Sequence, residues 1–123
     1  MKIGFVPVAP FFLIYGGCET QLIHPYQILC ERGVDVVQVD YFDKEIKYDV
    51  LHFFGLHYGN YRFMSMAKKA GIKIVLEPIS YATKKQKLGK AFHALNKFIK
   101  LPTTQHLHRE MLLLADYVIP NSY

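Results

Sequence analysis

The chain has 123 residues and a mass of 14.3 kDa, which is the size of one domain with its own hydrophobic core. Apolar residues make up 51% of it, which excludes an intrinsically disordered chain. The formal net charge of +5 indicates an anionic partner, so nucleic acid, an acidic membrane surface and a phosphorylated substrate all stay open at this point.

The opening residues predict a strand and a loop, not a leader or a membrane span. Pro7 and Pro10 interrupt the apolar run that begins at Ile3, and no small-residue cleavage site follows. No segment approaches the ~20 apolar residues of a membrane span. If Cys18 and Cys30 share one helix, they lie roughly 18 Å apart, too far for a disulfide. We therefore expect a cytoplasmic protein.

Strands and helices alternate along the chain. The first strand leads through a glycine loop into a helix, in which Pro25 predicts a kink or a start near His24, and which Gly33 should end. Asn60 should cap the next helix, and Gly71 should close it. The expected strands are residues 2–8, 34–41, 47–54, 72–76 and 117–119, and the later helices are 61–70, 84–100 and 103–115.

This alternation predicts an α/β fold, namely a Rossmann-like, doubly wound and mostly parallel sheet with helices on both faces. Residues 1–123 would form a single domain with the strand order 3-2-1-4-5, numbered along the chain. Ligands of such sheets bind beyond the carboxyl ends of the strands, where the order reverses, here between the first and fourth strands. The loop 10–17 and residues 77–80 would line that crevice.

The first candidate site is the loop that contains Gly16, Gly17 and Glu19. Glycine lets a ligand approach the backbone closely, and a helix start offers free N–H groups and a positive dipole end, which suits a phosphate or a sugar. A simple turn that caps the helix is the alternative. Neither a dinucleotide-binding fingerprint nor a P-loop is present, which disfavours a dinucleotide cofactor site and a P-loop ATP site.

Two histidines and a glutamate fall where the third and fourth strands end. His52 and His57 could donate a hydrogen bond to a substrate oxygen or act as acid or base. Glu77 could accept hydrogen bonds from sugar hydroxyls or act as a general base. The alternative for the two histidines is a structural, half-buried position. The alternative for Glu77 is a solvated strand end with no function. Because no third ligand has suitable spacing, no metal site is expected.

Residues 84–100 predict a helix with an apolar side and a cationic side, because no acidic residue occurs among them. This composition suits a helix that lies on anionic lipid, but an ordinary helix that packs its apolar side on the sheet fits an α/β layer well and is favoured. No nucleic-acid-binding signature accompanies it, so no nucleic-acid partner is expected. The candidate membrane-surface residues are Lys84, Lys85, Lys87, Lys90 and Lys97.

Five segments, taken in order, resemble the N-terminal domain of GT-B-fold glycosyltransferases of family 4. The likeness covers essentially the whole chain. The segments are the strand-and-proline opening, residues 16–19 with a helix end at 31–36, residues 48–53, residues 72–76, and residues 114–122.

The resemblance implies transfer of a sugar from a nucleotide-sugar to a glycan or lipid-linked acceptor, with retention of configuration and without a metal or other cofactor. It implies that this domain receives the acceptor while a missing C-terminal domain holds the nucleotide, so that the chain alone would be inactive and could self-associate through exposed apolar surface. Many family members place a histidine after the fourth strand, where this chain has Glu77-Pro78. The candidate acceptor or sugar contacts are His52, His57, Glu77, Ser80 and Ser122.

The alternative is a stand-alone Rossmann-like module that binds a phosphorylated ligand or a protein partner without catalysis. A phosphoacceptor receiver domain is disfavoured, because Pro7 and Pro10 stand where its acidic cluster would follow the first strand. The fold alone does not separate a transferase from a binding module.

Overall fold

Parallel strands and their connecting helices make up the part of the chain that the computed structural model describes, which is residues 1–8, 13, 16–79 and 103–120; the side chains of Cys18 and Glu19 are also outside this description. The strands are β1 (Lys2–Val6), β2 (Asp35–Gln38), β3 (Val50–Phe54), β4 (Lys73–Glu77) and β5 (Tyr117–Val118). The helices are α1 (Gly17–Glu31), α2 (Tyr58–Lys69) and α4 (Thr104–Leu114).

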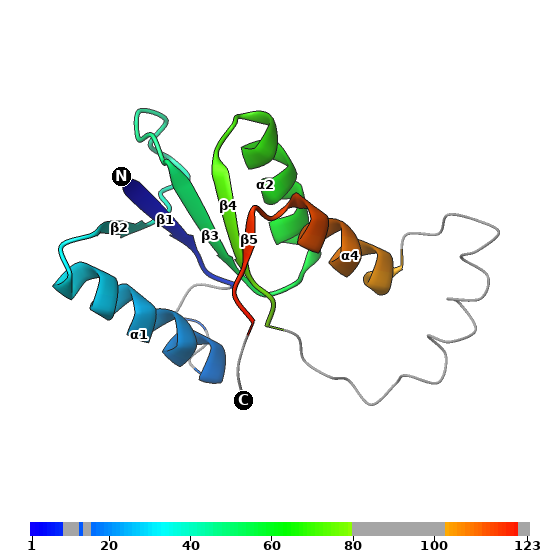
Figure 1. Cartoon of the computed structure of the whole chain (residues 1–123), viewed down its shortest axis with the longest axis horizontal. Coiled ribbons are helices and arrows are strands. Elements are labelled where there is room, and N and C mark those ends of the chain that lie inside the picture. Colours follow the sequence, from blue (N-terminus) through cyan, green and yellow to red (C-terminus); the bar gives the residue numbers. More distant parts are fainter. Residues whose placement is uncertain (9–12, 14–15, 80–102, 121–123) are drawn as a thin grey trace.

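The sheet has the order β2-β1-β3-β4-β5, and each neighbouring pair is parallel (Figure 1). The Rossmann-like α/β fold is thus confirmed, but the predicted order 3-2-1-4-5 is wrong. β3 is apolar apart from His52 and almost fully buried along its length, which is the profile of a central strand. β2 exposes Asp35 and Gln38 and forms the edge. The order therefore reverses between β1 and β3, not between the first and fourth strands.

Helices cover both faces of the sheet, as the sequence predicts. Figure 1 shows α1 on one side of the strands and α2 with α4 on the other. On the α1 face, Leu22 packs with Phe5 and Phe54 in one buried cluster. On the opposite face, Met64 and Met111 pack against Phe53 in a second cluster. Successive side chains of a strand point to opposite faces, so Phe53 and Phe54 serve different layers.

Two helices end on a glycine in the left-handed region, as predicted. Gly33 follows α1 with φ 73°, and Gly71 follows α2 with φ 76°. The N–H of Gly33 donates to the carbonyl of Cys30 at 2.9 Å, and the N–H of Val34 donates to the carbonyl of Leu29 at 3.0 Å. The same two bonds recur after α2. Both ends are Schellman motifs, which satisfy the last carbonyls of each helix.

Helix α1 begins at Gly17 and continues past Pro25, so of the two expectations for Pro25, a kink or a start near His24, the start near His24 is wrong. A proline inside a helix removes one hydrogen bond and costs about 3 kcal/mol. Leu22 before the proline and Leu29 after it both pack on the α1 face of the sheet. This packing along both halves of the helix outweighs the local cost.

Helix α2 begins at Tyr58 because His57, and not Asn60, is its N-cap. Nδ1 of His57 accepts a hydrogen bond from the N–H of Asn60 at 3.4 Å. The side chain of Asn60 is buried and donates instead to the carbonyls of Phe54 and Gly55, at 2.8 and 3.0 Å. The predicted cap at Asn60 is therefore wrong, because the carbonyls at the end of β3 accept hydrogen bonds from the side chain that would have capped the helix.

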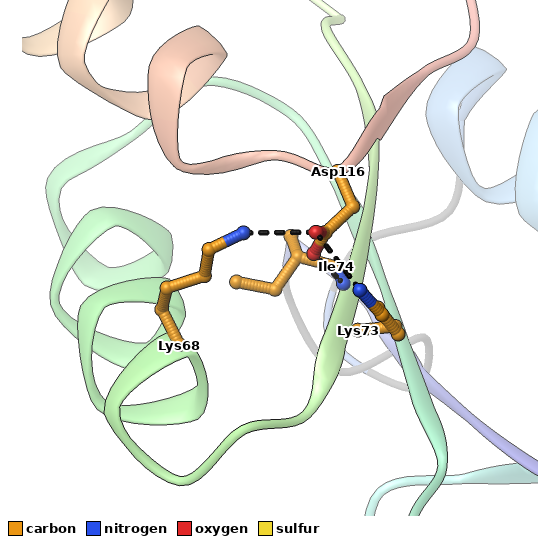
Figure 2. A network of polar contacts seen from close by, with 4 residues as sticks. All are labelled: Lys68, Lys73, Ile74 and Asp116. Carbon is orange, nitrogen blue, oxygen red and sulfur yellow. Dashed lines mark hydrogen bonds and ion pairs between the residues drawn. The ribbon is translucent and has the colours of Figure 1, made fainter.

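Asp116 fixes β5 to its neighbours (Figure 2). One carboxylate oxygen accepts from the N–H of Ile74 at 2.9 Å, while the other lies 2.9 Å from Nζ of Lys68 and 3.6 Å from Nζ of Lys73. The hydrogen bond from Lys68, followed by the one from Ile74, lowers the pKa of Asp116 below its usual value. The ionised carboxylate thus links β4, α2 and the start of β5.

Candidate functional site

The carboxyl ends of the parallel strands meet at one edge of the sheet, and α1 begins at the same edge (Figure 1). Parallel sheets bind their ligands at this edge, next to the strands between which the order reverses. Two of the predicted site regions, the start of α1 at Gly17 and the end of β4 at Glu77, lie here.

His52 and Glu77 form a buried polar pair on the α1 face. Their side chains are 9% and 10% exposed, and Nε2 of His52 lies 3.8 Å from Oε2 of Glu77. The imidazole stacks on Phe54, with 4.3 Å between ring centroids, and meets Phe5 edge-on at 4.9 Å. The two aromatic rings therefore fix the orientation of His52 toward the carboxylate.

Burial shifts the pKa values of the two groups in opposite directions. It lowers the pKa of His52 to about 4 and raises the pKa of Glu77 above its usual value. His52 is therefore neutral at pH 7. Its Nε2 is buried and has no hydrogen-bond partner among the described residues. An unpaired buried polar atom costs about 1–3 kcal/mol, which a hydrogen-bonding ligand that reached this nitrogen would recover.

The start of α1 is open with respect to the described residues. A Cβ built on Gly17 would meet no described atom within 4 Å, and Gly17 is not among the described glycines with positive φ. Neither packing nor backbone conformation within the described chain thus requires glycine there. The carbonyl of Gly16 accepts from the N–H of Thr20 at 3.3 Å and from its hydroxyl at 3.1 Å, which closes the first turn. A phosphate could approach this first turn without displacing a side chain at Gly17.

A cavity of about 220 Å³ lies between α1 and the ends of β1 and β2. Phe5, whose ring contacts His52, forms part of its wall, together with Leu22 and Tyr26 of α1. The cavity is mostly apolar and offers Gln38 as a polar group at the end of β2. It lies on the α1 face, next to the carboxyl ends of β1 and β2.

The other predicted site residues do not join this pair. His57 caps α2 and lines a different pocket, so the fold separates the two histidines predicted at the end of the third strand. Ser80, Ser122 and the lysines at 84, 85, 87, 90 and 97 lie outside the described residues, as does the side chain of Glu19. No three His, Cys, Asp or Glu side chains gather as metal ligands within the described part of the chain. None of the helices described has the length and hydrophobicity to cross a membrane.

Comparisons with protein-family models, curated proteins and solved structures found no match to this chain. The proposals below therefore rest on the fold, the described contacts and the sequence motifs.

The pocket at the start of α2 contains residues that the sequence analysis did not single out. Tyr41, Tyr58 and Arg62 all line it. One signal was present in the sequence: Tyr58, Arg62 and Met66 follow each other at intervals of four residues, which places them on one face of a helix. Tyr41 joins them only through the fold.

Proposed function

We propose that this chain is the acceptor-side domain of a glycosyltransferase that moves a sugar from a nucleotide-sugar donor to a glycan or lipid-linked acceptor. One observation carries the proposal: the open helix start at Gly17 and the buried His52–Glu77 pair lie at the same edge and on the same face of the sheet. A helix start suits a diphosphate, and a polar pair at a strand end suits sugar hydroxyls. The order of motifs along the sequence supports the same function.

The described groups would act through hydrogen bonding and charge. The N–H groups of the first turn of α1 would stabilise the negative charge that builds on the departing diphosphate, a role that needs no titrating side chain. Glu77 would accept a hydrogen bond from a sugar hydroxyl, and Nε2 of neutral His52 would bind a neighbouring oxygen or hydroxyl. A second domain would hold the nucleotide and cover this edge. Under this proposal the protein acts in the cytoplasm, on the membrane surface where its acceptor is lipid-linked.

Gly17→Asp tests the proposal in the complete gene product. A carboxylate at a helix start is stabilised by the helix dipole, and no described atom lies within 4 Å of the new Cβ, so the fold should persist. The same charge repels a diphosphate, and we expect transfer to fall by about 100-fold, the effect of losing a well-placed oxyanion donor. The assay follows sugar transfer from a panel of nucleotide-sugars to membrane-derived acceptors, with thermal melting measured in parallel.

Gln27→Asp is the matched control, because it adds the same charge at an exposed position of the same helix, roughly 15 Å along the axis from its start. It should leave transfer unchanged. Normal transfer by Gly17→Asp with a normal melting temperature would overturn the role of the α1 start. Binding of nucleotide-sugars by the wild-type gene product without any transfer would favour the non-catalytic module instead.

A further inference from the structure

A second pocket opens at the start of α2, on the side of the sheet opposite α1. Its volume of about 440 Å³ falls within the usual range for small-molecule sites. Val8, just after β1, and His57, just after β3, both line it. It therefore lies where the strand order reverses, which is the usual place for a ligand in a parallel sheet.

The pocket carries positive charge that no described group compensates. Arg62 is exposed and takes part in none of the ion pairs among the described residues. No described residue that lines the pocket is acidic. A guanidinium binds carboxylate and phosphate groups in a paired, planar geometry, so its natural partner here is an anion supplied by a ligand. The first turn of α2 adds a positive dipole end at the same wall.

Two tyrosine rings stand beside this cation. Tyr41 and Tyr58 are each 67% exposed, although both line the pocket. Tyr41 is held in place, because its ring packs on Phe63 with 5.7 Å between centroids, and Phe63 meets Phe53 of the core edge-on at 5.2 Å. Tyrosine offers a broad apolar face and a hydroxyl at a low cost in ordering. Such faces pack well against the C–H side of a sugar ring.

His57 adds a hydrogen-bond donor to the same wall. Its Nδ1 accepts from the N–H of Asn60, so in the neutral ring Nε2 carries the proton. Nε2 is buried and has no hydrogen-bond partner among the described residues. Within the described part of the chain, the pocket thus combines a cation without a partner, two aromatic faces and a buried donor that makes no hydrogen bond.

We propose that this pocket binds a sugar that carries an anionic group, with the carboxylate or phosphate on Arg62 and the ring against Tyr41 and Tyr58. A neutral sugar would leave the guanidinium without a partner, and a bare inorganic anion would leave the tyrosine faces unused. In the proposed transferase this sugar would be the acceptor. Binding can nevertheless be measured without any transfer, so the site does not depend on the function of the α1 face.

The test is a titration of the whole chain, followed by amide chemical shifts in nuclear magnetic resonance and by calorimetry. The ligands are glucuronate, glucose 6-phosphate, neutral methyl glucoside and inorganic phosphate. We expect the shifts to concentrate on the amides of residues 58–66 for both anionic sugars, with affinities at least about tenfold higher than for the neutral glucoside or the inorganic anion. Tighter binding of the uronate assigns a carboxylate ligand, and tighter binding of the sugar phosphate assigns a phosphate.

Arg62→Gln should weaken the binding of either anionic sugar by at least about tenfold. Arg32→Gln is the matched control, since Arg32 is exposed beyond the end of α1, and it should bind like the wild type. Tyr41→Ala should weaken the anionic sugars while leaving inorganic phosphate unaffected. Equal binding of the neutral glucoside, equal binding of inorganic phosphate, or an Arg62→Gln variant that binds normally would each overturn the proposal.

Discussion

Lowering the pH from 7 to 5 should destabilise the folded chain through His52. Burial holds the pKa of His52 at about 4 in the fold, while its ordinary value is 6.5. Between these two values the unfolded chain binds a proton that the folded chain does not, so stability is lost as the pH falls. Through this one group the free energy of unfolding falls by about 2 kcal/mol at pH 5 and by about 3 kcal/mol below pH 4.

Glu77 acts in the opposite direction. Burial raises its pKa above the usual 4.5, so the folded chain holds this proton more tightly than the unfolded chain, and stability falls as the pH rises through that range. The wild-type profile alone would mix the two effects. His52→Phe separates them, because a phenyl ring has no titrating group and can take the place of the imidazole between Phe5 and Phe54.

The assay is urea unfolding at pH 5, 6 and 7, in the wild type and in His52→Phe, with each also prepared in a Glu77→Gln background. The wild type should lose about 2 kcal/mol more than His52→Phe between pH 7 and pH 5. At pH 7 the variant should be at least as stable as the wild type, because it lacks the buried unpaired nitrogen. The same pH slope with and without His52, in both backgrounds, would refute the reasoning.

Two further predictions concern the stability of the fold. Asp116→Ala removes a charged acceptor from the N–H of Ile74 and should lower the free energy of unfolding in urea by about 2–3 kcal/mol. The control is Asp35→Ala, which removes an exposed ion pair and should lower it by less than about 1 kcal/mol. Similar losses for both variants would contradict the role of Asp116. Gly4→Ala would bring a Cβ to within 2.7–2.8 Å of three packed side chains and should cost about 1–3 kcal/mol. Gly17→Ala, with no described atom within 4 Å, should not lower the melting temperature.

Features set by a few neighbouring residues could be predicted from the sequence. Gly33 and Gly71 end their helices because only glycine enters the left-handed region at little cost. The alternation of strands and helices likewise gives the fold class. The strand order could not be obtained in this way, because it depends on which strand pairs with β1. The sequence does contain one hint of the order. All residues of β3 except His52 are apolar, which indicates burial on both faces and therefore a place at the centre of the sheet.

The site depends on longer-range contacts, and the sequence predicted it less well. Local preference ranks asparagine above histidine as a helix cap and therefore favours Asn60. The carbonyls of Phe54 and Gly55 compete for that side chain, and His57 takes the cap. The contact of His52 with Glu77 similarly requires the register of β3 on β4, which no local pattern encodes.

The reversal of strand order explains why two candidate sites can share one edge. β1 leads to α1 on one face, while its neighbour β3 leads to α2 on the other, so the first turns of these helices diverge from adjacent strands. Pro7, the residue after β1, lines both cavities and separates the two faces at this point. Gly17→Asp therefore perturbs the α1 side and Arg62→Gln the α2 side. Loss of transfer with intact sugar binding in the first variant, and loss of sugar binding together with loss of transfer in the second, would assign the donor and the acceptor to opposite faces of β1.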